Sequence, residues 1–212
     1  MVPTCALDPP VRVPRMAQRR LAKGEQTRRR VLDAVIESVA RQGFAELSVA
    51  DIGRAAGMSS GHVLYYFETK DVLFVEALRH VEAALEDERA KLVTADEPVV
   101  RRLRRYLELY LPTGRTDPRW SLWVQVWSTA LTDTDLAAIQ AGLDAAWQHD
   151  LDLLVRAGVA DGSFTCADPE MAEAAIAGLL DGLALRLMTT PEQQSADGFV
   201  DLAEGACLAL LR

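Results

Sequence analysis

Two short helical patterns joined by a glycine turn, between Ser48 and Lys70, constrain this chain of 212 residues more than any other feature. Ser48 precedes Asp51 by three residues, which is the spacing of a capping box at a helix N-terminus. Gly57 can adopt the positive φ that ends a helix, and Ser59 is a suitable N-cap for a second helix. Two short helices around a glycine-containing turn form a helix-turn-helix. The segment is therefore predicted to be a helix-turn-helix.

The charge of the chain is divided unevenly along its length. The whole sequence has a net charge of −8, which argues against a protein that coats nucleic acid indiscriminately. Residues 1–70 contain 11 Lys and Arg against 7 Asp and Glu, a balance of +4, whereas residues 71–212 contain 12 against 24, a balance of −12. A basic N-terminal third on an acidic body indicates a nucleic-acid-binding head with a separate regulatory or assembly body.

Composition excludes several other classes of protein. Half of the residues are hydrophobic, which is enough for a substantial core. The cysteines Cys5, Cys166 and Cys207 are odd in number and widely spaced, so neither a disulfide framework nor a metal cluster is predicted, and a reducing cytoplasm is the expected location. No apolar run approaches the roughly 18 residues of a membrane span, and residues 1–15 lack a signal-peptide core. We expect no metal and no cofactor.

The N-terminal segment, residues 1–22, contains four prolines beside several arginines and little apolar periodicity. We predict a disordered basic arm. Such an arm can reach a DNA minor groove, as in some helix-turn-helix proteins, but a solvated tail is the preferred interpretation. Met16 is an alternative to Met1 as the native start.

The first long helix is expected from about Gly24 to Gln42, because apolar residues repeat there at three- and four-residue spacing. Arginines 28–30 lie at its start. Cations at a helix N-terminus oppose the helix dipole, so they indicate an external anion such as DNA phosphate. A solvated charged face is the alternative.

The second helix of the motif carries most of the predicted DNA contacts. Small side chains at Ser60 and Gly61 allow close approach to base edges in the major groove. Ser59, Tyr66 and Lys70 are expected to contact phosphate. Leu64 and Tyr65 are expected at thymine methyl groups and His62 at a polar base edge, whereas Val63 and Phe67 are expected in the core. The predicted DNA-binding residues are Arg28, Ser48, Ser59, Ser60, Gly61, His62, Leu64, Tyr65, Tyr66 and Lys70.

The run GFAELSVADIGRAAGMSSGHVLYYFETKDVLF, residues 43–74, resembles the DNA-binding signature of TetR/AcrR-family transcriptional regulators. The glycine–x–serine turn, the small residue pair, the Tyr-Phe ending and Lys70 follow the family's order. With the helix back to Arg28, the resemblance covers roughly a quarter of the chain. It implies an all-α protein with a three-helix DNA-binding domain, a helical ligand-binding and dimerisation bundle, and repression relieved by a small molecule. Ser60 departs from the Lys or Arg of many members, and Leu64 from a position that is often aromatic.

The body is predicted to be helical throughout. Thr69 is a suitable cap for a helix to about Val93, and Asp168-Pro169 is a capping residue followed by proline at the first helical position. The other predicted helices cover about 99–110, 120–127, 134–158 and 199–210, with Gly158 expected to close the fourth helix of the body.

Trp120, Trp123 and Trp127 share one face of a predicted helix. Core packing is the preferred interpretation, and a pocket wall is the alternative, because aromatic faces attract cations and can hold quaternary ammonium groups. The predicted ligand-binding residues are Tyr106, Tyr110, Trp123, Trp127 and Trp147. The Trp-rich body also resembles the BetI-like, choline-responsive subgroup, although no ligand is carried over from it, and an aromatic or cationic effector is expected.

The last two helices are rich in small and apolar residues. They can pack together within one subunit, or form a four-helix dimer interface across a two-fold axis. We favour the dimer, because a helix-turn-helix usually binds two half-sites. The predicted dimerisation residues are Ile176, Leu179, Leu180, Leu183, Leu187, Phe199, Leu202, Ala206 and Leu210.

Three parts are therefore expected: the arm (1–22), the DNA-binding domain (23–70) and the ligand-binding and dimerisation domain (71–212). We expect a cytoplasmic homodimeric repressor that a small molecule releases from a palindromic double-stranded operator. An activator, or a regulator without an effector, is the alternative. A helical enzyme is a remote alternative, because the sequence has no P-loop, dinucleotide fingerprint or GxSxG motif. A helical adaptor is equally remote, because it would not need the basic head.

Overall fold

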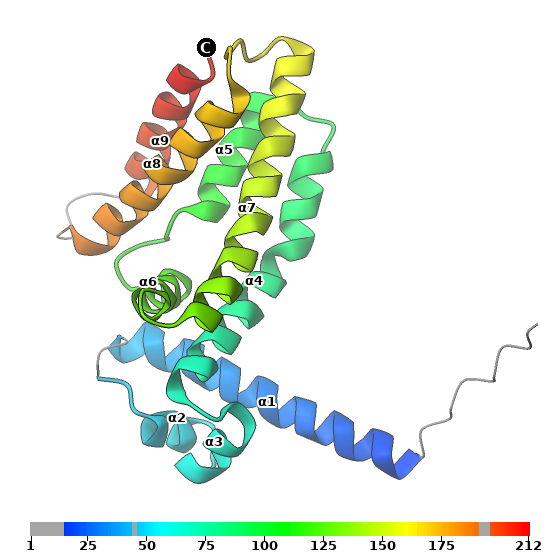
Figure 1. The fold of residues 1–212 in the computed structure, drawn as a ribbon, viewed down its shortest axis with the longest axis vertical. Helices are drawn as coiled ribbons and strands as arrows, with labels where there is room; N and C mark the ends of the chain where they lie inside the picture. The colour runs from blue at the N-terminus through cyan, green and yellow to red at the C-terminus, as the bar shows by residue number, and fades with distance from the viewer. Residues whose placement is uncertain (1–14, 44–45, 191–195) are drawn as a thin grey trace, which may run out of the picture.

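The computed structural model describes residues 15–43, 46–190 and 196–212, and within these ranges the chain forms nine α-helices and no strand (Figure 1). The prediction of an all-α fold with a three-helix N-terminal unit is confirmed. The helices are α1 (Arg15–Gln42), α2 (Val49–Ala55), α3 (Ser60–Phe67), α4 (Lys70–Thr94), α5 (Val99–Tyr110), α6 (Pro118–Ala130), α7 (Thr134–Asp161), α8 (Pro169–Thr189) and α9 (Ala196–Leu210).

The helix-turn-helix of α2 and α3 has the predicted caps. The backbone N–H of Asp51 donates to Ser48 Oγ at 3.2 Å, and the Ser48 N–H donates to the Asp51 carboxylate at 3.1 Å. Gly57 has φ +68°, and Ser59 accepts from the His62 N–H at 3.2 Å. A Cβ on Gly53 would lie 2.8 Å from the carbonyl oxygen of Met58, so this glycine allows the turn to pass close to α2.

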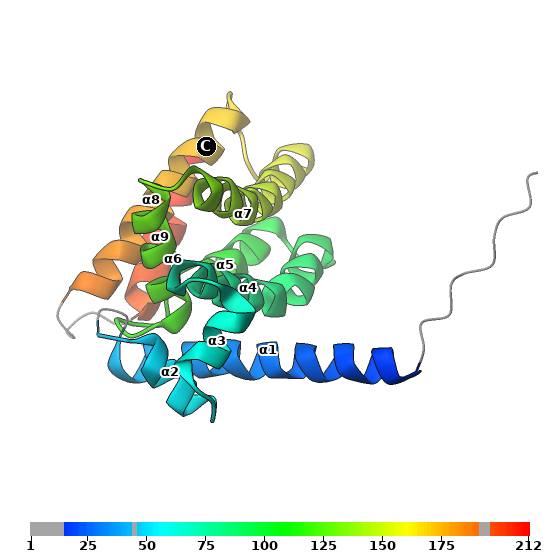
Figure 2. The ribbon, with the colours of Figure 1, turned by 60° about the horizontal axis from the view of Figure 1, so that its bottom comes forward.

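Helix α4 leads from the head into the body, where it packs against α5, α6 and α7. Thr69 caps it through a hydrogen bond from the Val72 N–H, as predicted. Helix α6 lies between the body and the head, because it packs against α1 as well as α4 and α7 (Figure 1). Helices α8 and α9 lie side by side along one edge of the body (Figure 2). No helix in the described part of the chain is long and apolar enough to cross a membrane.

Helix α1 is longer than predicted. It begins at Arg15 rather than near Gly24, so residues 15–22, expected to be disordered, are helical, and the expected boundary at residue 22 falls inside a helix. The four prolines all precede Arg15, and the Arg, Met, Ala, Gln, Leu and Lys residues that follow are strong helix formers. The N-terminal half of α1 projects away from the other helices (Figures 1 and 2). The remainder of the predicted arm lies outside the described residues.

Gly158 does not end α7, which continues to Asp161 and is closed by Gly162 at φ +79°. Gly158 is instead buried inside the helix, where a Cβ would lie 2.1–2.7 Å from ring atoms of Phe164. The glycine therefore permits close packing of the ring on the helix backbone, a requirement that periodicity does not show.

Five of the predicted dimerisation residues are buried inside the subunit, as expected for the alternative in which the last two helices pack together within one chain. Helix α8 packs against both α7 and α9, and this packing uses most of its apolar stripe. The buried residues are Ile176, Leu180, Leu183, Leu187 and Phe199. Of the other predicted residues, Leu202 and Leu210 are exposed, and Leu179 and Ala206 are half-buried. Met171 and Leu185, which were not among the predicted residues, are also exposed.

We expect Gly158→Ala to lower the free energy of unfolding by about 1–3 kcal/mol, because the new methyl group overlaps the Phe164 ring in a filled core. Gly142 is a matched control, since it is an exposed glycine of α7 with no atom within 4 Å of an added Cβ. Gly142→Ala should raise stability by about 0.5–1 kcal/mol. Urea unfolding at one protein concentration measures both, and equal effects of the two changes would contradict the packing role.

Candidate functional site

Helix α3 presents most of its predicted DNA-contacting residues to solvent. Tyr65 is 79% exposed and Leu64 36% exposed, and Ser60, Gly61 and His62 are also exposed. No atom lies within 4 Å of a Cβ added to Gly61, so the surface around it is open. Val63 and Phe67 are buried in the head, as predicted. The helix therefore has one face in the core and one free for a partner.

Aromatic contacts hold the exposed face of α3 in shape. The rings of Tyr65 and Tyr66 meet edge to face at 5.4 Å, and the His62 ring lies 5.4 Å from Tyr66. Tyr66 is half-buried, so it supports its two exposed neighbours from beneath. Lys70, at the start of α4, lies over the ring of Phe74 at 5.4 Å.

Arg28, predicted to contact phosphate, makes contacts within the head, and its side chain is 33% exposed. Its guanidinium donates to the carbonyl oxygen of Tyr66 at 3.0 Å and to the Glu76 carboxylate at 2.9 Å, and it lies over the Phe67 ring at 4.6 Å. Arg28 therefore joins α1 to the end of α3 and to α4. The partners are 38 and 48 residues away in sequence, so helix periodicity could not identify them.

The predicted contact residue Ser48 already has a structural role in its capping box. Its hydroxyl also contacts the Asp51 carboxylate, which pairs with Arg54 at 2.8 Å. Hydrogen bonds from Ser48 and Arg54 lower the pKa of Asp51. This network fixes the start of α2.

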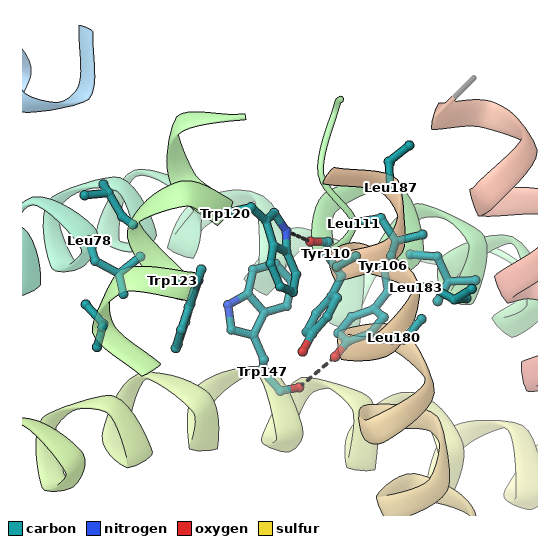
Figure 3. Packing of buried hydrophobic residues seen from close by; sticks show 14 of the residues in the cluster. Leu78, Tyr106, Tyr110, Leu111, Trp120, Trp123, Trp147, Leu180, Leu183 and Leu187 are labelled. Carbon is teal, nitrogen blue, oxygen red and sulfur yellow. Dashed lines mark hydrogen bonds between the residues drawn. The ribbon is translucent and has the colours of Figure 1, made fainter. Parts of the chain in front are cut away.

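A cavity lined mainly by aromatic rings lies among α5, α6 and α7. Its volume is only about 10 Å³, room for about one water molecule, so in this conformation the rings nearly fill it and a larger ligand has to move them apart. Figure 3 shows three of its tryptophans and Tyr110 grouped together. The lining residues are Tyr110, Arg119, Trp120, Trp123, Trp127, Asp144 and Trp147.

Four of the five predicted ligand-binding residues line this cavity, namely Tyr110, Trp123, Trp127 and Trp147. The fifth, Tyr106, is buried behind them: its ring stacks on Tyr110 at 5.8 Å, and its hydroxyl donates to the carbonyl oxygen of Trp147 at 3.2 Å. It supports the wall rather than forming it.

The prediction missed three lining residues. Trp120 was weighed with Trp123 and Trp127 as core or pocket wall and left out of the predicted ligand-binding residues. It is buried, and it meets both Tyr110 and Trp127 edge to face at 5.7 Å in the wall. Arg119 and Asp144 are the two charged residues of the lining. In the sequence, Arg119 lies next to Trp120 and Asp144 lies three residues before Trp147, and nothing else there indicates a ligand-binding role.

The buried Arg119 closes the C-terminal end of α5. Its Nη2 donates to the carbonyl oxygens of Leu109 and Tyr110 at 2.8 and 2.5 Å, where the helix dipole favours a cation. Its guanidinium lies 5.5 Å from the centre of the Trp147 ring. Burial lowers the pKa of Arg119, and the nearby Glu82 carboxylate opposes that effect.

Two carboxylates stand beside the cavity, and neither forms an ion pair with a cation of the described residues. Burial raises the pKa of Asp144, and the negative charge of Asp181 raises it further. Asp181 accepts from the Tyr110 hydroxyl at 2.6 Å, and Asp144 accepts from Gln148 at 3.3 Å. Burial also raises the pKa of Asp181. A small cation entering the cavity would stabilise the charge of Asp144.

Glu82 on α4 is a further buried carboxylate that the prediction missed. It is 5% exposed and accepts hydrogen bonds from the indole N–H groups of Trp123 and Trp147, both at 2.8 Å. Its spacing from Leu78 and Leu85 places it on the apolar face of α4. The sequence could have indicated this residue, because an acidic side chain on the apolar face of a helix is expected to be buried and a buried charge needs partners.

Within the described ranges, no group of three or more His, Cys, Asp or Glu residues is arranged to hold a metal ion. The cavity and the exposed face of α3 are the candidate sites that the sequence predictions point to. Helix α6 lines the cavity, and it packs on α1 of the head.

Comparison with known proteins matches both halves of the chain. Residues 31–77 match the family described as bacterial regulatory proteins, tetR family, and residues 99–212 match BetI-type transcriptional repressor, C-terminal. The HTH-type transcriptional regulator BetI of Pseudomonas aeruginosa (strain LESB58) is 27% identical over 180 residues, covering 83% of this chain and 88% of the relative.

Solved structures agree with the sequence comparison. A transcriptional regulator from Saccharomonospora viridis in complex with choline superposes with a TM-score of 0.76 at 26% identity, covering 85% of this chain and 95% of that one. The multidrug binding protein EbrR, complexed with imidazole, gives a TM-score of 0.60 at 25% identity, covering 87% and 94%.

We expect Asp144→Asn to stabilise the ligand-free protein at neutral pH. Because the folded pKa of Asp144 is raised, ionising it costs stability as the pH rises from the unfolded value through the folded one. The gain from asparagine should therefore vanish in acid, where the aspartate is protonated in both states. Asp87→Asn, at an exposed position of α4, is the control. Thermal melts from pH 4 to 8 test this, and a gain that is constant with pH would contradict it.

Proposed function

Since this chain belongs to the TetR family of bacterial regulatory proteins, with a C-terminal domain of the BetI type, we propose that it is a homodimeric repressor that a small cation releases from a palindromic operator. DNA binding and transcriptional regulation follow from the family. The effector class, the dimer and the residue roles are the proposal, and the aromatic cavity with its uncompensated Asp144 is the observation that carries it. Operator binding places the protein in the cytoplasm.

In the proposed complex, the exposed face of α3 enters the major groove. Ser60 and Gly61 permit close approach of the helix, while Tyr65 and Leu64 supply apolar contacts to base edges. Ser59, Tyr66 and Lys70 contact phosphate and fix the register of the helix. Arg28 contributes by holding the end of α3 against α1 and α4 rather than by touching DNA.

The proposed effector is a small onium compound. Aromatic faces attract a cation within about 6 Å of a ring centre, and clustered rings are a known means of holding quaternary ammonium groups. The Asp144 carboxylate adds a negative charge to the cavity wall. The related regulator from Saccharomonospora viridis was solved with choline, whose positive charge suits these rings and Asp144. Because the cavity of the ligand-free protein holds only about 10 Å³, choline binding requires the wall residues to move apart.

The proposed dimer forms through the outer faces of α8 and α9. Met171 and Leu202 are 67% and 57% exposed there, and Leu185 and Leu210 are exposed to 38% and 40%. Exposed Gly178 and Gly182 on α8 allow a second helix to approach closely. An interface that uses the same patch on both subunits has two-fold symmetry, which matches two operator half-sites.

Release from DNA is proposed as a population shift. The cavity lies mostly against α6, which packs on α1 of the head. A cation that binds more tightly to one arrangement of α6 and α4 favours that arrangement, and with it a different spacing of the two heads. Allosteric coupling is typically about 1–3 kcal/mol, which corresponds to a change of roughly 5- to 150-fold in DNA affinity.

Replacing Lys70 with alanine should weaken binding to operator and random DNA by a similar factor, because a phosphate contact carries no sequence information. Tyr65→Ala should cost about 1–3 kcal/mol on operator DNA and little on random DNA. Electrophoretic mobility shifts at one fixed salt concentration measure both. Leu131→Ala, at an exposed position of the body, is the control, and equal losses on both DNAs for Tyr65→Ala would contradict its role in base contact.

Choline should release the wild-type protein from DNA of its own upstream region, and Trp127→Ala and Asp144→Asn should each require a higher concentration. Trp127 provides a half-buried wall and Asp144 the charge. The measurement is the choline concentration at half release, with Asp87→Asn as the control. Wild-type protein that stays on its operator at saturating choline, tetramethylammonium and betaine would contradict the proposed effector class.

A further inference from the structure

Glu82 stands directly behind the aromatic wall of the cavity without lining it. It is 5% exposed and lies on α4, whereas the wall residues that it contacts come from α6 and α7. The indole of Trp147 lies between Trp123 and Tyr110 (Figure 3). A charged group in this position affects the cavity through the rings it contacts and through its own charge.

The contacts of Glu82 divide its two carboxylate oxygens between two helices. Oε1 accepts from Trp123 Nε1 and Oε2 from Trp147 Nε1, each at 2.8 Å. Arg119 Nη1 lies 3.8 Å from Oε1. Each oxygen thus has an indole donor, and a guanidinium stands nearby, which is the environment that a buried carboxylate requires.

A hydrogen bond from an indole N–H to a carboxylate alters the ring as well as orienting it. Such charge-assisted bonds are short and strong, and in a low-dielectric interior they polarise their partners. Polarising the N–H bond moves electron density into the indole, whose negative face is what attracts a cation. Two of the four tryptophans of the cavity wall are polarised in this way.

The position of Arg119 adds to the same effect. Its positive charge is part of the wall and disfavours a cationic ligand, and its Nη2 is held by the carbonyl oxygens at the end of α5. The nearby carboxylate of Glu82 offsets this charge. Without Glu82, the wall would keep a buried guanidinium and lose the anion that balances it.

We propose that Glu82 is the specificity-determining residue of the cavity, which makes it select a cation over a neutral molecule of the same shape by acting through Trp123 and Trp147. This inference rests on the proposed function, because it takes the cavity to be the effector site. It goes further in assigning cation selectivity to a residue that the ligand does not touch.

The test compares choline with 3,3-dimethylbutan-1-ol, which has the same shape but carbon in place of the charged nitrogen. Isothermal titration calorimetry measures the affinity of both for the wild-type protein, Glu82→Gln and the control Glu86→Gln, which makes the same change at an exposed position one turn along α4. Glu82→Gln should weaken choline about 10-fold or more, as expected for loss of roughly 1.4 kcal/mol. The affinity for the neutral alcohol should change less than about threefold, a difference within ~0.7 kcal/mol.

A second variant separates polarisation of the ring from loss of the fold. Trp123→Phe keeps an aromatic wall but removes the N–H that Glu82 accepts. It should reduce the preference for choline in the same direction, and combining it with Glu82→Gln should cost less than the sum of the two single changes, because they act on one interaction. Indole N–H exchange, followed by NMR, should be slow for Trp123 and Trp147 in the wild type and faster for Trp147 in Glu82→Gln.

Each outcome decides the matter. Loss of choline selectivity together with faster indole exchange supports the inference. Equal loss of both ligands, or unchanged selectivity in Glu82→Gln, overturns it while leaving the proposed effector class intact. Wild-type protein that binds neither ligand overturns the proposed effector class, and the inference with it.

Discussion

A negative charge buried among three helices determines how the centre of this molecule is built. The Glu82 carboxylate lies on the apolar face of α4 and cannot remain there ionised without donors. Trp123 of α6 and Trp147 of α7 provide them at 2.8 Å, and Arg119 of α6 stands at 3.8 Å. These contacts tie α6 and α7 to α4 and set the positions of two indoles in the cavity wall. The cavity's shape and charge therefore depend on one residue outside it.

The same helix carries the link to the head. Six residues before Glu82, Glu76 accepts from Arg28, which also holds the carbonyl oxygen of Tyr66 at the end of α3. The six residues from Glu76 to Glu82 span about 9 Å along an α-helix. Helix α6 makes a second link, because it lines the cavity and packs on α1. In the proposed mechanism, a cation in the cavity acts on α3 through α4 and α6.

Local signals predicted the parts of the fold that depend on local chemistry. The capping box at Ser48, the turn at Gly57 and the caps at Ser59 and Thr69 were confirmed, and so was the packing of Val63 and Phe67. The start of α1 at Arg15 and the position of Gly158 inside α7 were predicted wrongly. Contacts between residues distant in sequence were not predicted: those of Arg28 with Tyr66 and Glu76, the burial of Leu180, and the convergence of two indoles on Glu82 from 41 and 65 residues away. Helical periodicity identifies the buried face of a helix but not the element that covers it.

Linkage between the cavity and the operator is the most direct test of the account. If choline releases the repressor by favouring one state of the protein, then operator DNA must weaken choline binding by the same factor by which choline weakens DNA binding. Calorimetric titration of choline into the free protein and into its complex with upstream DNA measures that factor. We predict a loss of choline affinity on DNA of roughly 5- to 150-fold, equal to the loss of DNA affinity in choline. Choline that binds free and DNA-bound protein equally well would contradict the central claim.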